Sequence, residues 1–141
     1  MRNLFLNLAI LLFSTSVFSA DLQIEMLNKR SDGARMVYSE DIAKVDVGQT
    51  VEWVAKDKGH NVEMIAGPDG AELPKKSKLS KNFSMKFDKA GIYIYKCSPH
   101  VGMGMIGIIV VGGDTSNKGA ISKVKLPGKA KKKRNALLEG I

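Results

Sequence analysis

The sequence predicts an all-β protein, a two-sheet Greek-key sandwich that runs through about Gly112 and is followed by a short extension of two helices. Short segments of alternating apolar and polar residues recur along the chain, and turn-forming residues separate them. Two further segments, 91–97 and 106–111, are apolar on both faces. After residue 113 the alternation stops and helix-start signals appear. The 141 residues leave room for one modest domain.

Residues 1–19 are expected to be a secretory signal peptide outside the folded domain. Arg2 gives a positive start, Leu4 to Phe13 is apolar, and small residues follow. The apolar run is shorter than the roughly 20 residues that span a bilayer, and no second run follows. Val17 and Ser19 suit a cleavage site, so we expect cleavage after Ser19 or Ala20. A single domain at 20–141 remains, in a periplasm-like compartment, and its formal net charge falls from +8 to +7 because only Arg2 is lost.

The expected strands follow in order from the alternation and the turns. In the first, Leu22, Ile24 and Met26 alternate with polar residues, which indicates one buried face. Turn clusters lie at 31–33 and 67–70. The segments 91–97 and 106–111 lack a polar face, which is typical of central strands. We expect an antiparallel arrangement of strands at 21–27, 42–47, 50–55, 61–65, 82–87, 91–97 and 106–111.

Two helices are expected after the strands. Asp114 is a plausible cap for a short helix over 114–123, and Pro127 opens a second helix that runs through Leu138. The segment 123–134 is rich in lysine, and the ordinary interpretation is a solvated helix face. A nucleic-acid or membrane patch is the minority interpretation of such a run.

The chemistry-bearing residues gather in two short loops. His60 follows the strand that contains Trp53, and Cys97 and His100 lie between the two central strands, just before Met103 and Met105. Singly, each has an ordinary structural explanation, since a buried cysteine behaves as a small hydrophobe and methionine fills core space. Together they include every histidine and the sole cysteine of the chain. An unpaired thiol in an oxidising compartment must be buried or bound to a metal.

Two imidazoles, one thiolate and a weak thioether form the donor set of a trigonal copper site. The sulfur donors favour Cu⁺, while the imidazoles also suit Cu²⁺, so one ion can change oxidation state with little rearrangement. Zinc would accept histidine and cysteine but gains little from a thioether. The spacing Cys-x-x-His-x-x-x-x-Met lets one loop present three ligands, and His60 comes from a distant strand. The sequence therefore predicts one copper ion (Cu⁺/Cu²⁺) per chain.

These residues make the chain similar to the cupredoxins, and among them to the pseudoazurin group. The segment 57–63, DKGHNVE, resembles the family's first ligand loop, and 97–106, CSPHVGMGMI, resembles the second. The segment 26–29 resembles the opening strand and turn. The helical tail from Asp114 favours the pseudoazurin group over plastocyanin and amicyanin, which usually end at the last strand. The lysine-rich stretch 129–134 departs from the commonest pattern.

The resemblance implies a plastocyanin-like cupredoxin sandwich and assigns roles in the copper site. It makes His60, Cys97 and His100 the strong ligands and Met105 the long axial ligand. Met103 would instead belong to the apolar surface around His100. Two neighbours would support the site. Asn61 would tie the two ligand loops together and offer its backbone N–H to the Cys97 sulfur, and Pro99 would stiffen the loop without adding a donor.

The expected function is electron transport by a periplasmic blue copper protein that is not an enzyme and acts as a monomer. An apolar patch around His100, extended by Met36, Met64 and Met103, would contact an acidic redox partner. The resemblance suggests a copper nitrite reductase or another respiratory reductase, with a c-type cytochrome upstream. Lysines would steer that partner, while those of 129–134 are expected on a helix away from the ligand loops. The steering lysines are Lys29, Lys58, Lys76, Lys78 and Lys96.

Three other functions account for the sequence less well. A copper enzyme usually needs more histidines than the two present. A periplasmic copper chaperone or storage protein is the alternative that shares the ligands, and reversible one-electron cycling without metal loss would separate it from an electron carrier. A basic binding module without metal leaves the ligand cluster unexplained, and export makes nucleic acid an improbable partner.

Overall fold

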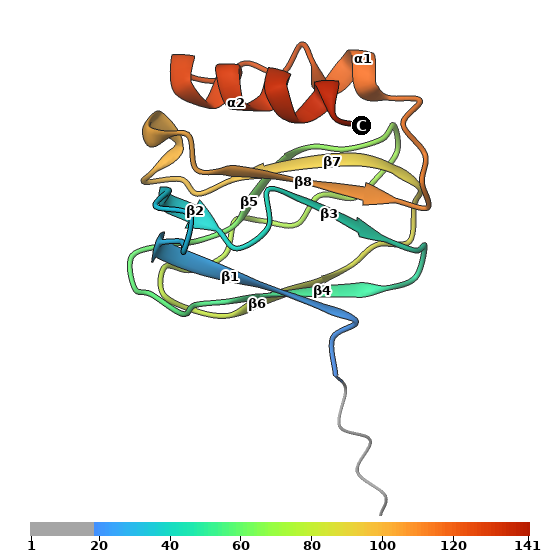
Figure 1. The fold of residues 1–141 in the computed structure, drawn as a ribbon. Coiled ribbons are helices and arrows are strands. Elements are labelled where there is room, and N and C mark those ends of the chain that lie inside the picture. The colour runs from blue at the N-terminus through green and yellow to red at the C-terminus, as the bar shows by residue number, and fades with distance from the viewer. Residues whose placement is uncertain (1–18) are drawn as a thin grey trace, which may run out of the picture.

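Two four-stranded sheets pack face to face, and helices cover the outer side of one of them (Figure 1). This computed structural model describes residues 19–141, so the expected signal peptide lies almost wholly outside the described residues. The first sheet has the order β2-β1-β4-β6 and the second has β3-β8-β7-β5. The strands of the first are β1 (Leu22–Lys29), β2 (Arg35–Tyr38), β4 (Thr50–Val54) and β6 (Phe83–Lys86). Those of the second are β3 (Ile42–Val45), β5 (Glu63–Ala66), β7 (Gly91–Lys96) and β8 (Ile106–Val111).

Each sheet contains one parallel pair, so the antiparallel arrangement expected for the strands holds only for the other neighbours. β1 runs parallel to β4, with Ile24 opposite Trp53, and β3 runs parallel to β8. The remaining neighbours are antiparallel. From β2 onward to β7 the chain changes sheet at every connection, so these strands do not pair with the strand that follows. Alternation predicts which face of a strand is buried, but it carries no information about the strand's neighbour.

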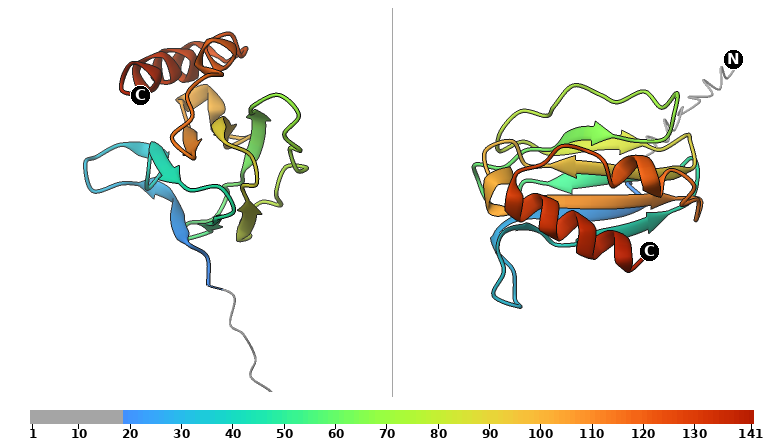
Figure 2. Two further views of the ribbon diagram at one scale, coloured as in Figure 1. Left: turned by 90° about the vertical axis from the view of Figure 1, so that its right-hand side faces the viewer. Right: turned by 90° about the horizontal axis from the view of Figure 1, so that it is seen from above.

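The core confirms the faces predicted from alternation. Trp53 and Tyr38 are fully buried between the sheets, where the Trp53 ring lies edge-on to Tyr95 at 5.1 Å between centroids. β7 and β8 are buried on both faces, as their sequences predicted. Their outer face, which includes Ile94 and Ile108, packs against Ile121 and other apolar residues of the helical extension. Figure 2 shows the helices lying across this side of the sheet. Because of that helical layer, both central strands can be apolar throughout.

The helical extension has a shorter first helix than predicted. α1 spans Lys118–Ile121, and α2 spans Gly128–Glu139 after Pro127. Asp114 does not cap a helix, because its carboxylate accepts a hydrogen bond from the Ser116 N–H at 2.8 Å within a turn. Asn117 then ties the segment to the sheet, since its side chain bonds both the N–H and the carbonyl of Ile92 at 2.8 Å.

The first turn of α2 packs against the second ligand loop, so the expectation that this helix lies away from the ligand loops is wrong. The loop contains a short 3₁₀ helix, η1 (Val101–Met103), that contacts α2. A Cβ built at Gly104 would lie 3.7 Å from the Cβ of Lys129. The sequence predicted that this helix begins after Pro127 but held no information about its neighbours, which in the structure are η1 and β8.

Ion pairs fasten the middle of α2 to the sandwich. Lys133 Nζ lies 2.6 Å from the Asp41 carboxylate, which Arg30 also contacts at 3.1 Å. Burial would raise the pKa of Asp41, but the hydrogen bonds from Arg30 and Lys133 outweigh it and hold that pKa below its usual range. Arg134 is buried, and its guanidinium donates to the carbonyl of Val124. Part of the basic run is therefore structural.

Candidate metal centre

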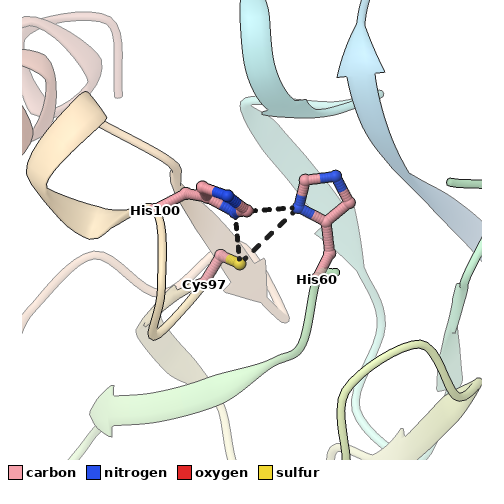
Figure 3. A group of neighbouring side chains, drawn as sticks. All are labelled: His60, Cys97 and His100. Carbon is pink, nitrogen blue, oxygen red and sulfur yellow. Dashed lines mark hydrogen bonds between the residues drawn. The ribbon is translucent and has the colours of Figure 1, made fainter. Parts of the chain in front are cut away.

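Three side chains converge at one end of the sandwich (Figure 3). His60 comes from the connection between β4 and β5, Cys97 directly follows β7, and His100 precedes η1. The two Nδ1 atoms lie 3.1 Å apart. The Cys97 sulfur lies 3.7 Å from Nδ1 of His60 and 3.5 Å from Nδ1 of His100. The fold thus brings together the three strong ligands predicted from the sequence.

The size of this triangle suits a metal ion. A point equidistant from the three donor atoms lies about 2.0 Å from each, close to the roughly 2.0–2.3 Å of metal–imidazole and metal–thiolate bonds. Two nitrogens and one sulfur in a nearly equilateral arrangement form the trigonal set that blue copper sites use. His60 and Cys97 are fully buried, which restricts water at the site. The residues present therefore fit copper.

Asn28 fixes the ring of His60, a role that sequence reasoning missed. The Asn28 side-chain oxygen lies 2.9 Å from Nε2 of His60. An oxygen acceptor there keeps the proton on Nε2, which leaves the Nδ1 lone pair free to bind a metal. Burial, followed by the charge of His100, lowers the pKa of His60, so the ring is neutral near pH 7. Asn28 belongs to the quoted segment 26–29, but no sequence signal linked it to His60.

The Cys97 thiol is set back from solvent. Burial raises its pKa, and backbone hydrogen bonds from Asn61 and His100 act in the opposite direction. Those N–H donors would stabilise the thiolate once a metal replaces the proton. The cysteine has no partner for a disulfide in this chain. Its environment suits a metal ligand better than a reactive surface thiol.

Asn61 ties the two ligand loops together. Its amide donates to the Ser98 hydroxyl at 3.0 Å, and its side-chain oxygen accepts the Ser98 backbone N–H at 2.8 Å. The Ser98 hydroxyl in turn donates to Glu63 at 2.7 Å, and Lys96 Nζ lies 3.6 Å from the same carboxylate oxygen. Tyr38 donates to the carbonyl of Asn61 at 2.8 Å. Ser98, Glu63 and Tyr38 are supporting residues that the sequence did not reveal.

The methionines of the second loop have different surroundings. Met105 is fully buried, whereas the Met103 side chain on η1 is 51% exposed. The Cys97 N–H donates to the carbonyl of Met105 at 3.0 Å, which closes the loop behind the ligands. Gly104 lies between the two methionines with φ +92°, a left-handed conformation that favours glycine. Burial favours Met105 over Met103 as the inward-facing sulfur.

The residues predicted to dock a partner are only partly available at the surface. Met64 is 7% exposed and packs in the core, so its place in the docking patch is corrected. Its strand, β5, turns that side chain inward. Met36 is half-buried with φ +50°, and Lys96 is half-buried beside Glu63. Pro99 is exposed and borders a surface depression of about 650 Å³. The exposed lysines of the predicted set are Lys29, Lys58, Lys76 and Lys78, of which the last two line that depression.

Within residues 19–141, neither helix has the length and apolar character needed to cross a membrane.

Comparisons with known proteins agree with this geometry. A family model described as copper binding proteins of the plastocyanin/azurin family matches residues 24–112. The chain is 36% identical to a pseudoazurin of Paracoccus pantotrophus over 132 residues, which cover 92% of this chain and 90% of that protein. A pseudoazurin structure from Sinorhizobium matches with a TM-score of 0.78 at 43% identity, covering 83% of this chain and 92% of that one. One from Hyphomicrobium denitrificans matches with a TM-score of 0.77 at 36% identity, covering 84% and 96%.

Proposed function

The chain belongs to the plastocyanin/azurin family of copper-binding proteins, within its pseudoazurin group, and we propose that it carries single electrons through one copper ion held by His60, Cys97, His100 and Met105. The observation that carries this proposal is the triangle of two Nδ1 atoms and one sulfur, 3.1 to 3.7 Å on a side. Copper, when bound, supplies the one-electron couple between Cu⁺ and Cu²⁺.

The residues around the site favour electron transfer because they restrain the ligands. Asn28 holds the His60 ring, and the paired hydrogen bonds between Asn61 and Ser98 hold the loop that carries Cys97. Ligands that stay in place in both oxidation states lower the rearrangement that an electron transfer requires. His100 is half-buried, so it brings the site near the surface while Cys97 stays covered.

The test is optical. Adding cupric ion to the metal-free protein should produce intense visible absorption that ascorbate bleaches and ferricyanide restores. Cys97→Ser should lose this band, because the polarizable thiolate is absent, while Met103→Leu at an exposed position should keep it. Loss of copper on reduction, or a colourless copper complex, would contradict electron carriage and would favour copper storage or delivery.

We propose that the partner is an acidic redox protein that approaches the His100 end. Exposed Met103 and the depression beside Pro99 offer apolar contact, and Lys76 and Lys78 border that depression. Lys58 is exposed two residues before His60. Charges arranged around an apolar centre steer association without making the complex long-lived. By resemblance, a copper nitrite reductase or another respiratory reductase would accept the electron, and a c-type cytochrome would supply it.

Stopped-flow kinetics with a purified acidic reductase tests this surface. Lys58→Glu combined with Lys78→Glu should lower the second-order rate constant and flatten its dependence on salt, because exposed charges are screened beyond about 8 Å at physiological ionic strength. The matched control reverses the charge of two other lysines, with Lys44→Glu and Lys86→Glu. These residues pair with Val110 and Thr50, at the end of the sheets away from the ligand loops. Equal slowing by both double variants would show that net charge, and not this surface, governs association.

We further propose that the protein is exported to the periplasm, with residues 1–19 removed as a signal peptide. The support is the order of charge, apolar run and small residues at the start of the chain. β1 begins at Leu22, shortly after the proposed cleavage site. Mass spectrometry of the protein recovered from the periplasmic fraction should give a chain that starts at Ala20 or Asp21.

A further inference from the structure

The positive charge of this protein is concentrated in its helical layer. Residues 114–141 contain eight lysines and arginines but only two acids, so they hold +6 of the formal net charge of +8. These residues form α1, α2 and their connections, which lie together outside the sheet β3-β8-β7-β5 (Figures 1 and 2). The sandwich beneath is therefore close to neutral, and one side of the molecule is strongly basic.

A cleft runs along this basic layer between α1, the connecting segment and α2. It consists of two adjoining hollows of about 390 and 530 Å³ that share Ser122, Lys131 and Arg134. Arg134 is 3% exposed, and its guanidinium bonds the Val124 carbonyl and the Asn135 side-chain oxygen. Those bonds use three of the five N–H donors of the guanidinium. The cationic residues that line the cleft are Lys118, Lys123, Lys125, Lys131 and Arg134.

Of the lysines of this cleft, Lys118 donates from Nζ to the Ile141 oxygen at 2.9 Å, whereas Lys123, Lys125 and Lys131 form no ion pair with the described residues. Among residues 19–141, Lys133 is the one lysine of the layer in an ion pair, and its partner is Asp41. Among the residues that the structure describes, Glu139 is the only acidic side chain that lines either hollow. A group of like charges held close together repels itself, and an external anion relieves that repulsion.

The layer also lacks the apolar surface that a protein partner would need. Ala130 and Leu138 of α2 face the sheet and are buried. The exposed large apolar side chains of the described residues are Val47, Leu73, Leu79 and Met103, and none lies in 114–141. Protein interfaces depend on buried apolar anchors at their centre. An anionic lipid surface needs none, because basic side chains near it each contribute about 1 kcal/mol.

We propose that the helical layer binds the phosphate headgroups of an anionic membrane surface, with one phosphate seated in the cleft between Arg134 and Lys131. Lys123 and Lys125 contact neighbouring headgroups. Binding is electrostatic and peripheral, with no insertion of side chains into the acyl region. It does not depend on copper, and therefore does not rest on the proposed electron transfer.

The packing of α2 determines what a membrane-bound molecule presents to its partners. The first turn of α2 abuts η1, so the basic layer lies beside the ligand loops and does not cover them (Figure 1). A molecule resting on this layer would direct its copper end along the membrane plane. It would then meet membrane-attached partners by diffusion in two dimensions.

The experiment measures binding of the copper-loaded exported protein to vesicles. We expect binding to vesicles of phosphatidylglycerol and phosphatidylcholine in equal parts, and none to pure phosphatidylcholine. Lys123→Gln combined with Lys131→Gln should weaken binding by at least about tenfold, given the contribution of each basic residue near an anionic surface. The control, Lys81→Gln combined with Lys86→Gln, removes the same charge from β6 and the residues before it, in the sheet that the helices do not cover, and should change binding less than about threefold.

Four results would overturn the proposal. Equal weakening in both double variants would mean that net charge alone attracts the vesicles. Absence of binding to the anionic vesicles would remove the membrane surface as a ligand. Full displacement of the vesicles by millimolar inorganic phosphate would assign the cleft to a free anion. Slower electron transfer to an acidic reductase in the cleft variant, with unchanged vesicle binding, would assign the layer to a protein partner. The visible copper band checks that each variant is folded.

Discussion

Replacing Asn28 with alanine tests how the metal centre is held. The substitution removes the oxygen that lies 2.9 Å from Nε2 of His60, while the backbone N–H of Asn28 keeps its bond to Asp57. A buried donor left without an acceptor costs about 1–3 kcal/mol. Asn28 is exposed, so water can partly replace its oxygen, and we expect the loss in copper-binding free energy to lie near the lower end, about 1.4 kcal/mol.

The assay has two parts. Competition with a chelator should show copper affinity reduced by about tenfold, the lower end of what is typical when the partner of a metal-bound histidine is lost. Nitrogen NMR of the metal-free protein should show the His60 proton spread over both ring nitrogens. Asn82→Ala is the matched control, because Asn82 bonds Ala55 and Glu52 and does not bond a ligand. Wild-type affinity and an unchanged His60 tautomer in Asn28→Ala would refute the reasoning.

Three further predictions follow from the burial and the charges. Met105→Gln should keep a coloured site but lower its reduction potential in voltammetry, because a harder axial ligand favours Cu²⁺. If Met103→Gln lowered the potential and Met105→Gln did not, Met103 would be the axial ligand. The pKa of Asp41 is lower in the folded chain than the unfolded carboxyl pKa of about 3.9, so its ionised carboxylate stabilises the fold at pH values above about 3.9. This stabilisation is lost as the pH falls through the pKa of Asp41 in the folded chain. Asp41→Asn should therefore lower the free energy of unfolding by about 1–2 kcal/mol at pH 7 and have no effect in strong acid, as urea titrations at both pH values would show. Burial raises the pKa of the Cys97 thiol, so copper binding should release the thiol proton. The apparent copper affinity should therefore rise about tenfold per pH unit near neutrality. Calorimetry in buffers of different protonation enthalpy measures the released proton, and finding none would contradict this prediction.

The sequence predicted the strands because their periodicity is local, and it missed what depends on distant partners. β2 was not predicted, since Arg35–Tyr38 is short and the positive φ of Met36 interrupts the pattern. That strand places Tyr38 against the Asn61 carbonyl. The parallel direction of β1 beside β4 was equally hidden, yet it brings Asn28 to His60.

The ligands could be predicted because histidine and cysteine are rare in this chain and fall in two loops. Their supporting residues could not, because asparagine, serine and glutamate occur for many reasons. Glu63 and Ser98 meet only after β5 pairs with β7, with Glu63 opposite Lys96. The position of α2 beside η1 likewise depends on packing of the whole layer.

The row of side chains from Lys96 through Glu63 and Ser98 to Asn61 connects the surface with the loop of Cys97. An acidic partner of the kind proposed would compete with Glu63 for Lys96, and a Glu63 carboxylate released from this cation would accept more strongly from the Ser98 hydroxyl. Docking would therefore change the relative stability of the two copper oxidation states. Coupling of this kind is reciprocal in free energy. The oxidation state would then alter how long the partner stays, so that delivery of the electron itself hastens or delays the separation of the two proteins.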